Sequence, residues 1–246
     1  MKTKRIEKNR KWLSFVITLL ATLRGWKLLA NPQGMTVVSG SASAQANGSQ
    51  LNITVGQNTF LNWASFNIQQ GETTTFVQPG ANSVVFNNIG GTSASQIWGT
   101  LHANGTVILA NAYGFYFGPG SEIKVGGSFI ATTAPLTPDF GAGSAWQFTG
   151  MPPLASIVNY GTVQVGQNKS LYLIAEQIDN HGSLGAPGGS IGLYAGKQVL
   201  VSERADGRGL SASVQMPSGS VDNEGNITAD AGTIALQAQV VNQNGI

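Results

Sequence analysis

Apolar and polar residues alternate along residues 111–133, the clearest hydrophobic pattern in the chain. The apolar positions fall mostly on a period of two, which is typical of half-buried β-strands: Phe115, Phe117, Ile123, Val125, Phe129 and Ile130. Five glycines separate them and predict tight turns or close backbone approach: Gly114, Gly118, Gly120, Gly126 and Gly127. No side chain in this stretch suggests enzymatic chemistry, so the pattern predicts a function of the fold and its surface.

The C-terminal third of the chain repeats with a period of about 21 residues. Three sets of positions align within strand-like segments: Leu171, Ile191 and Ile234; Leu173, Leu193 and Leu236; Ala175, Ala195 and Ala238. An Asn-x-Gly element recurs in the same register at Asn159, Asn180 and Asn223, and a similar element ends at Gly245. Two elements that recur in one register indicate a solenoid.

One coil of a parallel β-helix fits this repeat best. Leucine-rich repeats have a similar period but a leucine consensus that is missing here, and a propeller blade needs about twice the length. We therefore predict an all-β fold: a right-handed, single-stranded parallel β-helix with coils of about 20 residues, an N-terminal cap and extra-helical β elements. We expect asparagine and glycine at the coil corners because both tolerate the left-handed conformation. The alternative is a β-sandwich whose turns coincide with this spacing.

The rest of the chain fits the same fold less regularly. Short β-branched or aromatic runs at residues 52–55, 73–77 and 83–86 predict strands. Residues 135–153 contain four prolines and predict an excursion between coils. Regular coils are expected over residues 154–246. Because the sequence stops inside a repeat, we expect a fragment or the front of a longer solenoid.

The amino-acid composition excludes several classes of protein function. Charged residues are 10% of the chain, against about 25% in average proteins, and 41% of residues are apolar, which does not fit disorder. The chain contains no cysteine, which removes zinc-thiolate, iron–sulfur and disulfide chemistry. A chain without covalent loops suits passage through a pore in the unfolded state.

Charge is divided unevenly along the chain. Eight of the 13 basic residues lie within the first 27 positions, and the body beyond residue 30 carries five basic and ten acidic residues, a net charge of −5. An acidic body argues against a nucleic-acid partner, because phosphate binding needs clustered Lys and Arg.

Residues 1–30 predict a secretory signal peptide. A basic segment precedes an apolar run over residues 12–23, which is too short to span a bilayer. Leu28-Leu29-Ala30 offers a cleavage site before Asn31. The alternatives are an uncleaved anchor and a second cleavage site at Ala42-Ser43-Ala44.

Several motifs recur in a fixed order between residues 31 and 133. They read Asn62-Trp63-Ala64-Ser65-Phe66-Asn67-Ile68, Thr75-Phe76-Val77-Gln78-Pro79, Ile89-Gly90-Gly91, Ser95-Gln96-Ile97-Trp98-Gly99 and Ala103-Asn104-Gly105. Phe117-Gly118-x-Gly120 and Val125-Gly126-Gly127 follow. Together these motifs resemble the haemagglutination-activity domain of filamentous haemagglutinin-like proteins, which is the secretion domain of the two-partner secretion pathway.

The resemblance implies a set of partner-recognition residues: Asn62, Trp63, Phe66, Asn67, Asn111, Gly114, Phe117, Gly118, Gly120, Gly126 and Gly127. The family typically carries Asn-Pro-Asn-Gly where this chain reads Asn111-Ala112-Tyr113-Gly114. Proline fixes φ and asparagine favours turns. We therefore expect this turn to be less rigid here.

The resemblance also implies a route and partners. The chain is expected to cross the periplasm unfolded and to meet the periplasmic domains of an outer-membrane β-barrel transporter, in part by adding a strand to a sheet edge. It then folds at the cell surface as an adhesin-like, monomeric protein whose target is a host-cell or glycan surface. No cofactor and no metal are expected.

A carbohydrate-binding or carbohydrate-degrading β-helix is the alternative function. Its candidate residues are Glu203, Arg204, Asp206 and Arg208, the pair Asp222 and Glu224, the histidines His102 and His181, and the aromatics Trp98, Tyr113 and Tyr116. Solvated loop charges, a surface turn and aromatic packing explain these residues better. The prediction is therefore a secretion module with no catalytic residue.

Overall fold

The structure is a computed structural model that describes residues 31–137, 139–140, 145–206 and 209–246. The predicted signal peptide at residues 1–30 and the candidate loop residue Arg208 lie outside the described residues. Within the described ranges the secondary structure consists of 25 strands. No helix long and apolar enough to cross a membrane occurs in this part of the chain.

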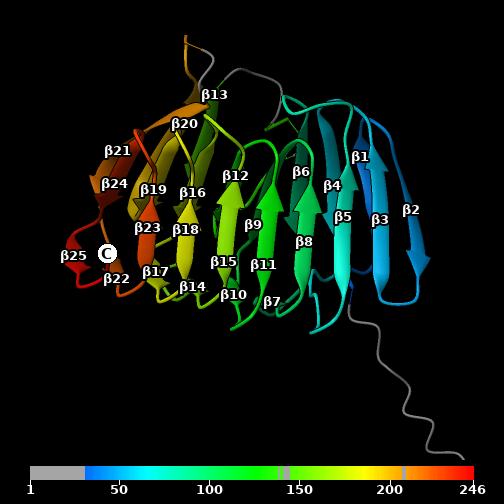
Figure 1. The fold of residues 1–246 in the computed structure, drawn as a ribbon, viewed down its shortest axis with the longest axis horizontal. Helices are drawn as coiled ribbons and strands as arrows, with labels where there is room; N and C mark the ends of the chain where they lie inside the picture. Colours follow the sequence, from blue (N-terminus) through cyan, green and yellow to red (C-terminus); the bar gives the residue numbers. More distant parts are fainter. Residues whose placement is uncertain (1–30, 138, 141–144, 207–208) are drawn as a thin grey trace, which may run out of the picture.

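Three long sheets run side by side along the molecule (Figure 1). Sheet A contains β2 (Ala42–Asn47), β3 (Gln50–Val55), β5 (Thr73–Val77), β8 (Thr100–Ala103), β11 (Glu122–Val125), β15 (Thr162–Val165), β18 (Ser183–Gly185) and β23 (Asn226–Thr228). Sheet B contains β1 (Thr36–Ser39), β4 (Thr59–Trp63), β6 (Val84–Ile89), β9 (Thr106–Asn111), β12 (Phe129–Thr132), β16 (Ser170–Ile174), β19 (Ser190–Tyr194) and β24 (Thr233–Gln237). Sheet C contains β7 (Ser95–Ile97), β10 (Phe115–Phe117), β14 (Ser156–Asn159), β17 (Gln177–Asn180), β22 (Ser220–Asn223) and β25 (Val240–Gln243).

The chain passes from sheet A to sheet B to sheet C in each complete coil, and equivalent strands of successive coils pair in parallel. This topology confirms the predicted parallel β-helix and excludes the β-sandwich. The aligned repeat positions are direct register partners: Leu171 pairs with Ile191, and Ile191 pairs with Ile234. Their side chains belong to one interior cluster that continues from Leu51 to Ala229.

Two antiparallel strand pairs form a cap at the N-terminal end of the helix. Strand β1 pairs antiparallel with β4, and β2 pairs antiparallel with β3. These two reversals confirm the predicted N-terminal cap. The second candidate cleavage site, Ala42-Ser43-Ala44, lies inside β2.

A fourth, three-stranded antiparallel sheet covers the outer face of sheet B. Sheet D contains β13 (Ala145–Thr149), β20 (Gly196–Glu203) and β21 (Leu210–Pro217). A second apolar cluster lies between the two sheets, with the Phe86 and Trp146 rings 5.8 Å apart. The Tyr172 hydroxyl donates a hydrogen bond of 2.6 Å to the Leu210 carbonyl. Sheet D is the predicted extra-helical element, and β13 comes from the proline-rich excursion.

The expected role of the corner asparagines is wrong. Asn159, Asn180 and Asn223 end strands of sheet C with negative φ, and their fully buried side chains point into the coil. The left-handed conformation occurs instead at Asn58 and Asn168. Gly182 also has no left-handed φ, but a Cβ there would overlap the Gly161 carbonyl oxygen of the preceding coil. Close coil stacking therefore explains the Asn-x-Gly element.

Candidate recognition site

The aromatic recognition residues predicted from the sequence lie inside the first coils. Trp63, Phe66 and Phe117 are buried in the interior cluster. The Trp63 and Phe66 rings meet edge to face at 5.4 Å. The Trp63 indole Nε1 donates a hydrogen bond of 2.9 Å to Oδ1 of Asn87 in the next coil. In the folded domain these side chains build the first coils and are buried away from any partner.

Asn62 and Asn67 join neighbouring coils through their side-chain oxygens. Nδ2 of Asn88 donates to Oδ1 of Asn62 at 3.1 Å. The backbone N–H of Gln96 donates to Oδ1 of Asn67 at 2.8 Å. The two asparagines therefore fix the register between the coil that contains them and the coil that follows.

Asn111 and Gly114 close the turn in which this chain departs from the family pattern. The Gly114 N–H donates to the Asn111 carbonyl at 2.9 Å, which makes a four-residue β-turn. The Asn111 side chain accepts from the Tyr113 N–H at 2.9 Å and donates to the Ser95 hydroxyl at 3.0 Å. Gly114 has φ +97°, and a Cβ there would overlap the Ser156 carbonyl. The two residues that match the family thus hold the turn, while Tyr113 is exposed.

Gly118 and Gly120 have different functions in the turn after β10. The Ser121 N–H donates to the Gly118 carbonyl at 3.0 Å, and Gly120 has φ +80° with open space around it. Proline at the second position and a left-handed glycine at the third are typical of a type II turn. A Cβ at Gly118 would instead overlap the Trp98 indole. Gly118 is therefore required for packing and Gly120 for backbone conformation.

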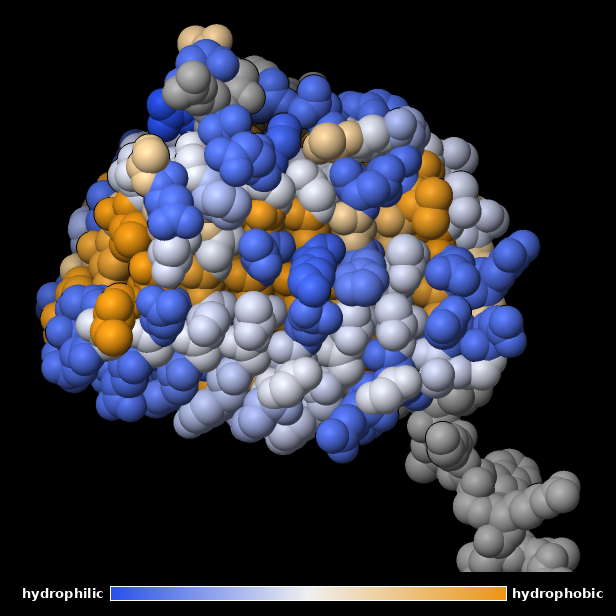
Figure 2. Space-filling view, in the orientation of Figure 1, coloured by the Kyte–Doolittle hydropathy of each residue, from blue (hydrophilic) through white to orange (hydrophobic). Residues whose placement is uncertain are grey.

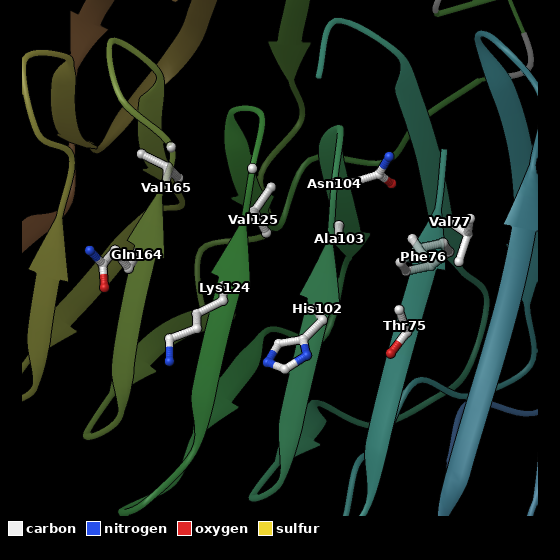
Figure 3. A pocket seen from close by; sticks show the side chains of 12 residues that line it. Thr75, Phe76, Val77, His102, Ala103, Asn104, Lys124, Val125, Gln164 and Val165 are labelled. Atoms are coloured by element: carbon white, nitrogen blue, oxygen red, sulfur yellow. The ribbon is translucent and has the colours of Figure 1, made fainter. Parts of the chain in front are cut away.

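Gly126 and Gly127 follow β11 on sheet A, beside a groove. A Cβ on Gly127 would overlap the backbone of Gly105, so both glycines permit close stacking of coils. A groove of about 680 Å³ crosses β5, β8, β11 and β15, and Gly126 is part of its lining (Figure 3). Its lining includes Phe76, Ala103, Val125 and Val165, which are register partners on successive coils. Figure 2 shows apolar surface across this face.

The polar wall of the groove comes from a row of register partners on sheet A. His102 pairs with Thr75 on one side and with Lys124 on the other. Lys124 also forms an ion pair with Glu122. Nε2 of His102 is inaccessible to solvent and makes no hydrogen bond within the described chain. His102 was not predicted to be part of a shared surface, because the register that places it there joins separate coils.

Gln78 and Asn104 form a corner network that our predicted set of recognition residues omits. The Asn104 side chain exchanges two hydrogen bonds of 2.7 Å with the Gln78 backbone. The buried Gln78 amide donates to the Ser83 and Thr106 carbonyls at 2.8 and 3.0 Å. Both residues lie in quoted motifs, Thr75-Phe76-Val77-Gln78-Pro79 and Ala103-Asn104-Gly105. Gln78 precedes a proline and Asn104 precedes a glycine, and this position at a turn was the sequence signal that could have identified them.

Four rings on successive coils form a stack along the corner between sheets C and A. Centroid separations are 5.2 Å for Trp98–Tyr116, 5.9 Å for Tyr116–Tyr160 and 4.5 Å for Tyr160–His181. Nδ1 of His181 then lies 3.0 Å from Oε2 of Glu224. A sugar ring stacks on an aromatic face, and here each ring packs against a neighbouring ring: Tyr160 and His181 are stacked with planes 7° apart, and the other two pairs are tilted at 45° and 44°. The arrangement supports structural packing over carbohydrate binding.

The charged candidates lie in two separate places. Glu203 and Arg204 line one pocket together with Lys169, and His181 and Glu224 line another. Arg204 pairs with Asp206 at 2.8 Å in the turn between β20 and β21. Asp179 and Asp222 are register partners on sheet C, and burial, followed by the charge of Asp222, raises the pKa of Asp179. Among the described residues no group of three or more His, Asp or Glu side chains could hold a metal ion.

Comparison with known proteins places this architecture in a family. The sequence matches the TPS secretion domain, the two-partner secretion domain, over residues 28–246. It is 34% identical to a heme/hemopexin-binding protein of Haemophilus influenzae over 222 residues, which cover 86% of this chain and 24% of that protein. A second heme/hemopexin-binding protein of Haemophilus influenzae is 37% identical over 115 residues, 47% of this chain and 11% of that protein.

A solved structure supports the same assignment. The crystal structure of the HMW1 secretion domain from Haemophilus influenzae superposes with a TM-score of 0.79 and 32% identity, covering 87% of this chain and 57% of that chain. The chain therefore belongs to the TPS secretion domain family and is the secretion domain of an exported bacterial protein. This family is not known as enzymatic. The chain spans about a quarter of the length of the first curated relative and less of the second.

Proposed function

We propose that this domain is recognised by an outer-membrane β-barrel transporter and then nucleates β-helix folding at the cell surface. The observation that carries the proposal is the family match over residues 28–246. The predicted recognition residues support it, because each one that we traced orders the first coils through a core contact, a hydrogen bond between coils or a glycine turn.

The interior cluster supports a role in nucleation. It continues without interruption from Leu51 to Ala229, so each new coil can bury its apolar face on the coil before it. Burial stabilises by about 25 cal/mol for each Å² of apolar surface. In a solenoid the stability is roughly a sum over neighbouring coils. Folding that begins at the N-terminal cap outside the cell would therefore draw the following chain outward without ATP.

We further propose that residues 1–30 direct export as a signal peptide and that the exported protein binds a target at the cell surface. The names of the curated relatives, heme/hemopexin-binding proteins, offer one class of target, and an adhesin-like contact with a host cell or glycan is another. These functions would belong to the whole exported protein.

The experiment is secretion by Gram-negative cells that carry the matching two-partner secretion transporter. The full chain, a deletion of residues 31–133 and an equally long deletion of residues 134–236 are compared, each with and without the transporter. We expect the deletion of residues 31–133 to abolish transporter-dependent appearance outside the cell, and the second deletion to retain it. Undiminished export without residues 31–133 would refute the proposal.

A further inference from the structure

Strand β2 ends sheet A at the N-terminal end of the molecule, and among the described strands it has a neighbour, β3, on one side only (Figure 1). All six of its residues pair with β3 in unbroken register, from Ala42 with Val55 to Asn47 with Gln50. Five of the six are exposed. A regular, exposed edge strand is a template for pairing with another strand.

The other N-terminal edges are obstructed. Strand β1 ends sheet B, but its register shifts between Val37 and Ser39, which interrupts the ladder. Strand β7 ends sheet C, and Ile68 forms a bridge with Ile97 there. Edge strands are commonly blocked by charge, proline or a bulge. Strand β2 has none of these, and residues 31–71 contain no charged side chain.

The direction of the free backbone groups follows from the pairing beside β2. The Ser41 carbonyl accepts from the Gly56 N–H at 2.8 Å, so the backbone of Ser41 faces β3. Successive residues of an antiparallel strand alternate in the direction of their backbone groups. Ala42, Ala44 and Ala46 therefore direct their N–H and C=O groups away from β3.

The side chains of these alanines limit the strand that could be added. Ala42, Ala44 and Ala46 pair with Val55, Ile53 and Leu51, which are buried, so the alanines lie on the interior face of sheet A. Ala44 and Ala46 are exposed, and no strand within the described ranges covers them. A strand with apolar residues at alternate positions would cover them and extend the interior by one layer.

The hairpin can exist before the coils stack. Strands β2 and β3 are joined by the two residues Gly48 and Ser49, and Gly48 has φ +58°. Local hairpins form quickly, but a two-stranded hairpin is only marginally stable in water. A third strand with an apolar face would supply the additional hydrogen bonds and apolar packing that a two-stranded hairpin lacks. The hairpin thus suits a partner that meets the chain during export.

Resting on the proposed function, we propose that β2 is the docking edge on which the transporter's periplasmic domain adds one extended strand. The added strand carries apolar residues at alternate positions and bonds to the backbone of Ala42, Ala44 and Ala46. This edge is continuous through β3 and β5 with the coils that hold the predicted recognition residues.

The test compares two substitutions at one position in the full chain, secreted by cells that carry the transporter. Ala44→Pro removes an outward N–H and leaves the hydrogen bonds to β3, whereas Ala44→Val keeps the N–H. We expect Ala44→Pro to slow secretion by roughly three- to tenfold, the effect of losing about one backbone hydrogen bond, and Ala44→Val to stay within about twofold of wild type. Equal rates for the two variants would overturn the proposal.

Cross-linking tests the contact between β2 and the transporter directly, without relying on a secretion rate that a folding defect could also lower. Because the chain contains no cysteine, Ser43→Cys on β2 and Asn226→Cys on β23 can each be labelled with a benzophenone maleimide. We expect transporter cross-links from position 43 and few from position 226. Cross-links only between two copies of the chain, or equal yields from both positions, would overturn the proposal. The two proposals can fail separately. If the β2 tests fail but the deletion of residues 31–133 blocks export, the proposed function stands and only the β2 proposal is refuted.

Discussion

Nδ2 of Asn159 donates a hydrogen bond of 2.8 Å to Oδ1 of Asn180, one coil further along, and both side chains are fully buried. Nδ2 of Asn180 donates in the same way to Oδ1 of Asn223 at 2.6 Å. Oδ1 of Asn159 accepts from the Gly161 N–H, which satisfies the first oxygen of the column. Three coils are thus joined inside the protein by a continuous column of side-chain amides.

We expect Asn180→Ala to destabilise the domain by roughly 1–3 kcal/mol, because it removes the hydrogen bonds that the buried Asn159 Nδ2 and Asn223 Oδ1 make with Asn180. The measurement is urea unfolding followed by circular dichroism. Asn226→Ala, at an exposed position of β23, is the matched control and should change stability by less than about 0.5 kcal/mol. Equal effects of the two substitutions would show that the column does not stabilise the stack.

Two glycines three positions apart should respond differently to alanine. In Gly182→Ala the new Cβ meets the Gly161 carbonyl oxygen, and we expect a loss of about 1–3 kcal/mol from overpacking. In Gly185→Ala the nearest atom is Cγ of Gln164 at 3.6 Å, an ordinary contact, so stability should be unchanged or rise by up to about 1 kcal/mol. Thermal unfolding of both variants checks the pair. A neutral Gly182→Ala would contradict the close-stacking explanation.

The turn at residues 111–114 should gain from proline. Ala112 occupies its second position, where proline is favoured in type I turns, and Tyr113 has a negative φ that fits this type. We expect Ala112→Pro to stabilise by about 0.4–1 kcal/mol, because proline restricts the unfolded chain. Gly114→Ala in the same turn should destabilise by roughly 1–3 kcal/mol because of its positive φ. Urea midpoints of the two variants that shift in the same direction would contradict this assignment.

Asp179 should make stability depend on pH. Burial raises its pKa above the usual 3.8, Asp222 and Glu224 raise it further, and His181 opposes them. The folded state therefore binds the proton more tightly, and the stability gained from that proton is present below pH 3.8 and lost as pH rises through the raised pKa.

Asp179→Asn removes the titrating carboxyl group and with it the loss of stability at higher pH. At pH 7 we expect the variant to be more stable than wild type by roughly 0.2–1 kcal/mol, the size of a pair interaction between neighbouring strands. The difference should shrink toward zero below pH 3.8. Unfolding midpoints measured from pH 3 to pH 8 test this, with Asp230→Asn at an exposed turn as the control. A gain that does not vary with pH would contradict the assignment to Asp179.

Much of the coil could be predicted from the sequence because it is a local property. Alternation identifies which side chains face inward, and the spacing of Leu171, Ile191 and Ile234 equals the path around the helix. The proline-rich excursion was also recognised, but its strand β13 was not. Its pairing partner, β20, lies about 50 residues further along the chain, and nothing local in either segment specifies the other.

The recognition residues also divide into properties that the sequence predicts and properties that only the structure shows. Trp63 could be selected by resemblance, but only the structure showed that it is buried, whereas alternation had already predicted an inward position for Phe117. Asn159 was correctly placed in a repeat and wrongly assigned a left-handed corner, because one sequence position can serve a turn or an interior column.

The sequence by itself therefore determined the all-β solenoid, its coil length and its register, since each follows from periodic apolar positions that stack on copies of themselves. Only the tertiary structure decided which glycines are needed for close stacking, that a groove crosses sheet A, and that the edge of β2 stays open. Those features depend on backbone atoms of different coils meeting within a few ångströms, and distances between coils are not encoded in any single segment.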